Sequence, residues 1–210
     1  MFIDASTIDP FVSTGVGKSL KDKNSTWEFA DAPVSGGVVG ATNGTLTFMV
    51  GANQNIVPIL EQILTLMGKR TIHCGQPGAG LSAKLTNNYL LALNNIASCE
   101  AMNLGLKLGL TAETLGEVIN SSTGRCWPSA VNNPVKGIVP GAPVDRDYEG
   151  GFGTRLMRKD LLLAIGAAEK AGLKMDMSVP AAEIYKKAAE DDRYGPKDFS
   201  VLYKMFSENN

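Results

Sequence analysis

Residues 31–52 read DAPVSGGVVGATNGTLTFMVGA, and this stretch decides the fold class. Its apolar start is typical of the end of a buried strand, Ser35–Gly37 of a bare loop, and TLTFMVGA of a second strand. Two glycines leave backbone N–H groups uncovered, so a small anion could reach the main chain at Ser35, Gly36 and Gly37. Glycine is also the most common turn residue, so a plain mobile turn is the alternative. The triplet alone leaves both interpretations open.

The first 75 residues alternate short apolar runs with helical patterns. The runs MFIDAS, WEFADAPV, TLTFMVGA and RTIHCG predict strands, and helices are expected after Asp9 and Pro10 and near Asn53–Met67. Such alternation indicates an α/β architecture. Ligands of open α/β sheets bind beyond the carboxyl ends of the strands, where STIDP (6–10) and SGG (35–37) are placed. The two polar loops are therefore expected to line one crevice.

After GQPGAG (75–80) the pattern becomes almost continuously helical, so a domain boundary is expected near Gly78. Residues 121–153 are rich in Pro, Gly and Asn and predict an irregular segment packed on the surface. The expected helices are a long one over Leu81–Leu108, one over Thr111–Asn120, one over Thr154–Ala171 that ends at Gly172, and two short ones near the C-terminus.

Composition excludes several classes of function. The net charge of −1 and the evenly mixed charges provide no basic stripe for nucleic acid, so a small-molecule partner is expected. The chain has a single histidine, His73, and its three cysteines are scattered, which argues against a metal site. The odd number and wide spacing of the cysteines indicate reduced thiols inside a cell. No stretch predicts a membrane span, and no signal or transit peptide is recognisable. Because Met1 is followed at once by a strand-like run, we expect the true N-terminus to be missing.

The long apolar helix carries polar residues that need a reason. It is apolar almost all round and is therefore expected to be buried. Lys84, Asn88 and Asn95 fall within about 40° of one another on the helical wheel, with Ser98 close by. A desolvated lysine with an amide one turn away suits a catalytic acid or base. A lysine that reaches solvent near the helix start, with asparagines bonded to neighbouring helices, is the alternative.

Several ordered motifs resemble the β-hydroxyacid dehydrogenase family, and within it the members that oxidise 3-hydroxyisobutyrate. They are DAPVSGGVVGATNGTLTFMVG, GAGLSAKLTNN, NLGLKLGL, SSTGRCW and GGFGTRLMRKDLLLA, and the match continues to the C-terminal KDFS. The resemblance implies an α/β partial Rossmann domain over residues 1–77, the C-terminal part of a dinucleotide-binding domain, followed by an all-α helical substrate and dimerisation domain over residues 78–210. It also implies NAD as cofactor and a homodimer or homotetramer formed through the helical domain.

The resemblance also assigns roles to single residues. Ser35, Gly36 and Gly37 would hold the substrate carboxylate, Lys84 would be the catalytic lysine and Asn88 would contact the substrate. Thr7 would lie beside the nicotinamide, and Lys159 would reach the cofactor side of the cleft. Asp160 would support that lysine. No metal ligand is implied.

One departure concerns the cofactor. The family opens with a strand and a G-x-G-x-x-G turn for the pyrophosphate, and residues 1–210 contain no such segment. GQPGAG does not replace it, because it precedes the long helix and its glycine spacing is wrong. An N-terminally truncated chain is therefore expected, with NAD binding in doubt.

The predicted function is NAD-dependent oxidation of 3-hydroxyisobutyrate to methylmalonate semialdehyde in valine catabolism. The family resemblance suggests the mitochondrial matrix. One alternative is reduction of tartronate or succinic semialdehyde with the same lysine and loop. The other is a truncated, catalytically dead product that keeps only the helical dimerisation domain.

Overall fold

The computed structural model describes residues 1–208, which form two compact units. The first unit consists of Met1–Asn87 and Leu163–Lys174, and the second of Asn88–Leu162 and the residues from Met175 onward. Helices α4 (Ala79–Lys107) and α7 (Thr154–Lys170) each contribute residues to both units. Each unit is described by itself.

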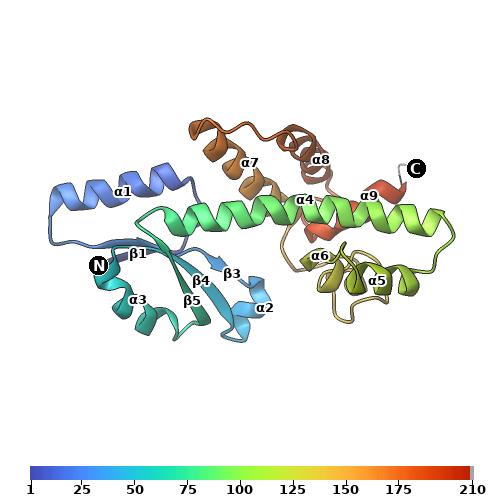
Figure 1. Cartoon of the computed structure of the whole chain (residues 1–210), viewed down its shortest axis with the longest axis horizontal. Helices are drawn as coiled ribbons and strands as arrows, with labels where there is room; N and C mark the ends of the chain where they lie inside the picture. The colour runs from blue at the N-terminus through green and yellow to red at the C-terminus, as the bar shows by residue number, and fades with distance from the viewer. Residues whose placement is uncertain (209–210) are drawn as a thin grey trace. The chain divides into compact units, whose positions relative to one another are not determined.

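A five-stranded mixed sheet forms the centre of the first unit (Figure 1). Strand β1 pairs in parallel with β2, and β4 pairs in parallel with β5 and antiparallel with β3. Strand β4, which follows the Ser35–Gly37 segment, therefore runs antiparallel to β3, which ends at Ser35. The α/β architecture expected from the alternating pattern is confirmed. The strands are β1 (Phe2–Asp4), β2 (Phe29–Asp31), β3 (Val34–Ser35), β4 (Leu46–Gly51) and β5 (Gly68–Gly75).

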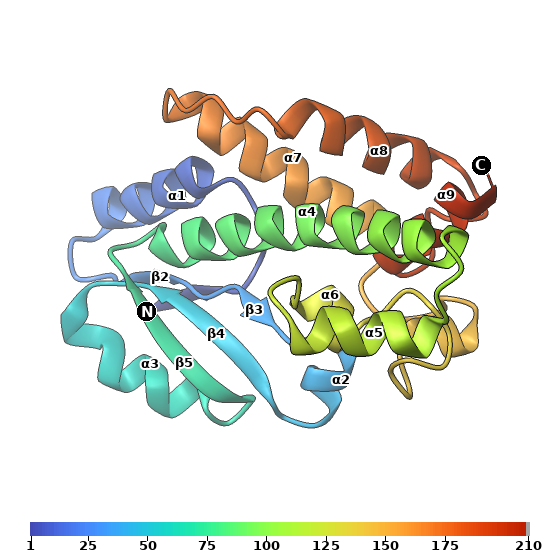
Figure 2. The same ribbon diagram turned by 45° about the vertical axis from the view of Figure 1, so that its right-hand side comes forward.

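Helices α1 (Pro10–Lys23) and α3 (Val57–Leu64) lie on opposite faces of this sheet (Figures 1 and 2). Asp9 caps α1 as predicted, because its side chain accepts hydrogen bonds from the amides of Phe11 and Val12. The helix approaches β2 closely at Gly17, where a Cβ atom would lie only 2.8 Å from the Phe29 ring. The 3₁₀ turn η1 (Gln54–Ile56) leads directly into α3.

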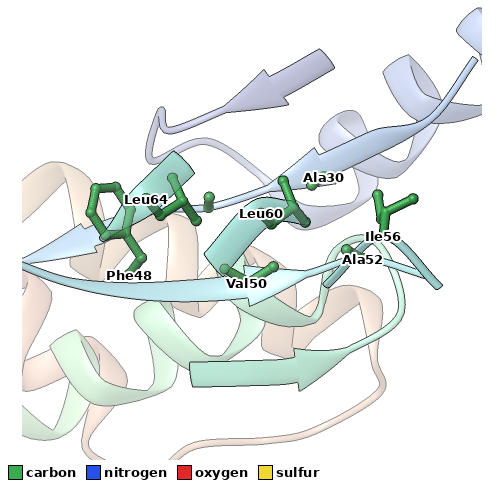
Figure 3. Close-up of a cluster of buried hydrophobic side chains, with 8 residues drawn as sticks. Ala30, Phe48, Val50, Ala52, Ile56, Leu60 and Leu64 are labelled. Carbon is green, nitrogen blue, oxygen red and sulfur yellow. The ribbon is translucent and has the colours of Figure 1, made fainter. Parts of the chain in front are cut away.

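The core beneath α3 consists of apolar side chains from β2, β4, η1 and α3 and from the residues directly after the two strands (Figure 3). Leu60 and Leu64 from the helix meet Phe48 and Val50 from β4, and all four are almost fully buried. Burial of this kind stabilises the fold by about 1.5–3 kcal/mol for each large side chain. The cluster is Ala30, Ala32, Phe48, Val50, Ala52, Ile56, Leu60 and Leu64.

The second unit is helical, as predicted, and its helices follow the expected ranges closely. Gly172 ends α7 with a φ of 72°, a conformation that glycine adopts without strain. Besides parts of α4 and α7, the helical segments are α5 (Ala112–Ser121), α6 (Trp127–Ala130), η2 (Pro143–Arg146), α8 (Ser178–Glu190), η3 (Phe199–Val201) and α9 (Leu202–Glu208).

The segment 121–153 is less superficial than its composition predicts. Asn132 and Asn133 are buried, and Tyr148 is buried with its hydroxyl donating to the carbonyl oxygen of Pro134 at 2.8 Å. Asp198 organises the end of this segment, because its carboxylate accepts hydrogen bonds from the Asn132 amide and the Phe152 backbone. Polar side chains here replace the apolar packing that the sequence lacks.

Helix α4 is buried along one stripe rather than on all sides, which corrects the expectation of an all-round buried helix. Within this chain Leu90 is 56% exposed and Leu104 is 61% exposed. The buried stripe repeats every three or four residues and contains Leu81, Leu85, Asn88, Ala92, Asn95, Cys99 and Met102. Over residues 1–208, none of the helices combines the length and apolar character needed to cross a bilayer.

Candidate functional site

The Ser35–Gly37 segment differs in one respect from the loop expected. Ser35 ends β3 and pairs with Thr47 of β4, but the short helix α2 (Gly37–Thr42) begins where the sequence predicted an irregular loop. The apolar side chains of Val38 and Val39 are both exposed on this helix. The helix forms because Gly36 and Gly37 turn the chain sharply, with φ values of 136° and 60°.

The backbone of this turn is accessible. Gly36 and Gly37 are both exposed, and a Cβ atom built on Gly37 would meet no other heavy atom within 4 Å. An anion could therefore approach the main chain here, which is the property that the sequence argument required.

Lys84 lies in the second turn of α4 and is buried, with 9% of its surface exposed. The start of this helix is held by Asp31 at the end of β2. The Asp31 carboxylate accepts hydrogen bonds from the amides of Gly78 at 2.5 Å and Leu81 at 2.8 Å. The lysine thus projects from a helix whose first turn is anchored to the sheet.

Asp31 is a residue that the sequence argument missed. Its side chain is fully buried, and burial raises the pKa of its carboxyl, while the amides of Gly78 and Leu81 oppose that rise. An available signal was the acidic residue within the apolar run WEFADAPV, where a buried carboxylate needs hydrogen-bond donors.

Thr7 lies half-buried in the connection between β1 and α1. Since β1 and β2 are parallel and Asp4 pairs with Asp31, this connection and the one after β2 leave the sheet at the same edge. Ligands of open α/β sheets bind at such an edge, and the ligand site predicted at STIDP stays a prediction.

In the second unit, Asn88 and Asp160 are in direct contact. The Asn88 Nδ2 atom donates to Asp160 Oδ2 at 2.6 Å, and both side chains are buried. Lys159 Nζ lies 2.9 Å from Asp160 Oδ1, and its side chain is 46% exposed. Asp160 therefore joins an amide and an ammonium group, the two residue types that the resemblance assigned to substrate and cofactor.

The other polar residues of the α4 stripe have structural partners. Asn95 donates to the carbonyl oxygen of Phe199 at 2.9 Å and contacts the Tyr185 hydroxyl at 3.1 Å. Ser98 contacts the sulfur of Cys126 at 3.3 Å. For Asn95 the interpretation as a bond to neighbouring helical segments is confirmed.

The pyrophosphate-binding part of an NAD site is not found among the described residues. Among residues 1–208, no strand-to-helix turn has the glycine pattern that holds a pyrophosphate. The N-terminus of α1, which follows a parallel strand, is already occupied by the Asp9 carboxylate. The cofactor roles that the resemblance implied for Thr7 and Lys159 stay predictions.

Comparison with known proteins matches almost the whole chain to domains of dehydrogenases. Residues 78–206 match the family described as NAD-binding of NADP-dependent 3-hydroxyisobutyrate dehydrogenase, and residues 1–75 match the NAD binding domain of 6-phosphogluconate dehydrogenase. Both matched regions are NAD(P)-binding domains of dehydrogenases.

Individual relatives agree with these matches. The chain is 45% identical to the probable mitochondrial 3-hydroxyisobutyrate dehydrogenase of Arabidopsis thaliana, over 98% of this chain and 61% of that protein. It is 45% identical to the mitochondrial 3-hydroxyisobutyrate dehydrogenase of Drosophila melanogaster, over 99% and 63%. The solved structure of Mycobacterium tuberculosis 3-hydroxyisobutyrate dehydrogenase with L-serine has a TM-score of 0.91 and 42% identity, covering 98% of this chain and 69% of that one. The chain spans about three fifths of the length of the curated relatives it matches.

Proposed function

The chain belongs to the 3-hydroxyisobutyrate dehydrogenase family, and on that premise we propose that it carries out the substrate-side chemistry of NAD-dependent oxidation of 3-hydroxyisobutyrate to methylmalonate semialdehyde. The observation that carries the proposal is the burial of Lys84 on α4, the helix with which the matched region 78–206 opens. A lysine held in a largely buried position can serve as a general acid or base towards a bound alcohol.

Each residue of the proposed site has a separate role in the reaction. Lys84 removes the hydroxyl proton of the primary alcohol, and the Ser35–Gly37 segment, exposed at its two glycines, binds the carboxylate. Asn88 contacts the substrate, and Asp160 orients both Asn88 and Lys159 through its two oxygens. The chemistry that bound NAD supplies is acceptance of the hydride from the alcohol carbon.

Replacement of Lys84 tests this proposal. Activity is measured in a chimera in which the chain replaces the matching stretch of the Drosophila relative. Lys84→Met is expected to lower kcat by at least about 100-fold, the effect of losing a general acid or base. Lys84→Arg should not restore it, because arginine does not release its proton usefully.

The matched control is Lys107→Met, which removes an exposed lysine at the other end of the same helix. It should turn over normally. Near-normal turnover of Lys84→Met would overturn the proposal, whereas inactivity of the unmodified chimera would favour the catalytically dead alternative.

The helical unit is proposed to form a homodimer or homotetramer. Leu90, Ala97 and Leu104 are exposed on α4 at seven-residue spacing, so they form one apolar stripe. Leu104→Asp should reduce the mass measured by light scattering, and Val118→Asp, at an exposed apolar site on α5, should not. The Arabidopsis and Drosophila relatives are named as mitochondrial enzymes, which supports a mitochondrial location that we propose to be the matrix.

A further inference from the structure

The strand β2 and the helix α4 are joined by a single buried carboxylate. Asp31 Oδ1 accepts the hydrogen bond from Gly78 and Oδ2 accepts the one from Leu81. The first four amides of a helix have no partner within the helix, so an acceptor that satisfies two of them fixes where the helix begins. The side chain is fully buried, and this bond pair is therefore shielded from water.

Two glycines bring the three elements into contact around that carboxylate. A Cβ atom on Gly51 of β4 would lie 2.3 Å from Asp31 Oδ1 and 2.8 Å from the amide nitrogen of Gly80. A Cβ atom on Gly80 would lie 2.2 Å from the carbonyl oxygen of Met49. Real Cβ atoms do not approach other atoms so closely. The start of α4 can therefore pack this tightly against β4 only because Gly51 and Gly80 have no side chains.

Two functional segments lie a few residues along the chain from the groups that this carboxylate joins. Four residues after Asp31 the chain reaches Ser35, which is held in register by pairing with Thr47. Three residues after Leu81 the helix reaches Lys84. A shift of α4 along or away from β2 would thus move Lys84 relative to the Ser35–Gly37 segment.

We propose that Asp31 is a positioning residue, which sets the place of Lys84 relative to the Ser35–Gly37 segment by fixing the start of α4 to the end of β2. This inference rests on the proposed function for its catalytic consequence. Its structural part stands on the hydrogen bonds and glycine contacts. A cap that only stabilises α4 would lower stability without changing turnover by the folded enzyme.

Amide hydrogen exchange in the 210-residue chain tests the structural part without any substitution. The Gly78 and Leu81 amides should be as protected as the Leu60 amide in α3, although ordinary first-turn amides exchange fast. Fast exchange at both would overturn the proposal. In Asp31→Asn, which keeps one acceptor oxygen, exchange at Gly78 or at Leu81 should accelerate by about tenfold or more with Leu60 unchanged.

Kinetics in the chimera test the catalytic part. Asp31→Asn should lower kcat by about tenfold or more at a temperature where the variant remains folded, since 1 Å of misplacement is costly in catalysis. Gly51→Ala keeps the carboxylate but pushes the helix away, and it should have the same effect. The control Thr111→Ala removes the cap of α5 at a similar cost in stability and should leave kcat unchanged.

The outcomes separate the two proposals. If Lys84→Met is inactive while Asp31→Asn and Gly51→Ala turn over like Thr111→Ala, the positioning role is wrong and the proposed function stands. If Lys84→Met is active, the proposed function fails, and the exchange pattern alone decides whether Asp31 fixes α4. If Asp31→Asn does not fold, exchange in the unsubstituted chain and the kcat of Gly51→Ala decide.

Discussion

The Asn88 amide and the Asp160 carboxylate are joined by a 2.6 Å hydrogen bond between two buried side chains. Asn88 comes from α4 and Asp160 from α7, 72 residues further along the chain. The other carboxylate oxygen lies 2.9 Å from the half-exposed Lys159 ammonium. A single acidic residue thus orients two groups that the proposed reaction needs.

Loss of the Asn88 amide should destabilise the helical unit. In Asn88→Ala the buried Asp160 carboxylate loses a donor, which typically costs about 1–3 kcal/mol. Urea unfolding of the chain should show this loss, and the effects of Asn88→Ala and Asp160→Ala should be strongly non-additive. Glu100→Ala, at an exposed position of the same helix, serves as the control. If Asn88→Ala were as mild as that control, the hydrogen bond would contribute nothing to the fold.

A methyl group on Gly37 should interfere with binding of the substrate carboxylate. Gly37 and Gly44 have nearly the same φ, 60° and 63°, and a Cβ atom on either would meet nothing within 4 Å. Gly37→Ala and Gly44→Ala therefore carry the same backbone cost, and only the first places a methyl group beside the proposed anion site. In the chimera, Gly37→Ala should raise KM for 3-hydroxyisobutyrate by about fivefold or more, as expected for weakening one charge-assisted hydrogen bond.

Gly44→Ala should leave KM unchanged, and an alcohol without a carboxylate should not distinguish the two variants. Equal effects of Gly37→Ala on both substrates would indicate a structural turn. Gly36 is a poorer test site, because its φ of 136° strains any side chain.

NAD should not bind measurably to the 210-residue chain alone. The residues described supply no glycine-rich turn for the pyrophosphate, and Asp9 already occupies the N-terminus of α1. Calorimetric titration of NAD into the chain should show no heat of binding, whereas the chimera should bind. Micromolar binding by the chain alone would mean that its own residues form a dinucleotide site of another kind.

The ion pair between Asp9 and Lys170 should make a small, pH-dependent contribution to stability. The Lys170 ammonium lowers the pKa of the Asp9 carboxyl, chiefly by a 2.6 Å hydrogen bond. An acid whose folded pKa is lowered contributes stability above its unfolded pKa, about 3.9, and loses it as the pH falls through the folded value.

A double-mutant cycle with Asp9→Asn and Lys170→Met measures that contribution. Half of the Lys170 side chain is exposed, so a coupling below about 1 kcal/mol is expected at pH 7. The coupling should vanish in strong acid. A coupling that grew as the pH fell would contradict this assignment.

Local sequence patterns predicted the start or end of an element wherever neighbouring residues alone determine it. Asp9 followed by Pro10 predicted the start of α1, and Gly172 predicted the end of α7, because capping and chain reversal involve only neighbouring backbone groups. The exposed backbone at Gly36 and Gly37 was predictable for the same reason. The short helix α2 was missed, because Val38 and Val39 favour strands and only the turn before them starts a helix.

The sequence by itself determined the α/β unit followed by helices, the family and the stripe that carries Lys84 and Asn88. These properties follow from periodicity and motif order along one chain. Only the tertiary structure decided which polar residue each of these groups meets. Asp160 is the partner of Asn88, Phe199 and Tyr185 are those of Asn95, and Asp31 is the acceptor for the start of α4. The physical reason is that a buried polar group must find a partner in space, and the partners here lie about 50 to 100 residues away in the chain, where no local pattern points to them.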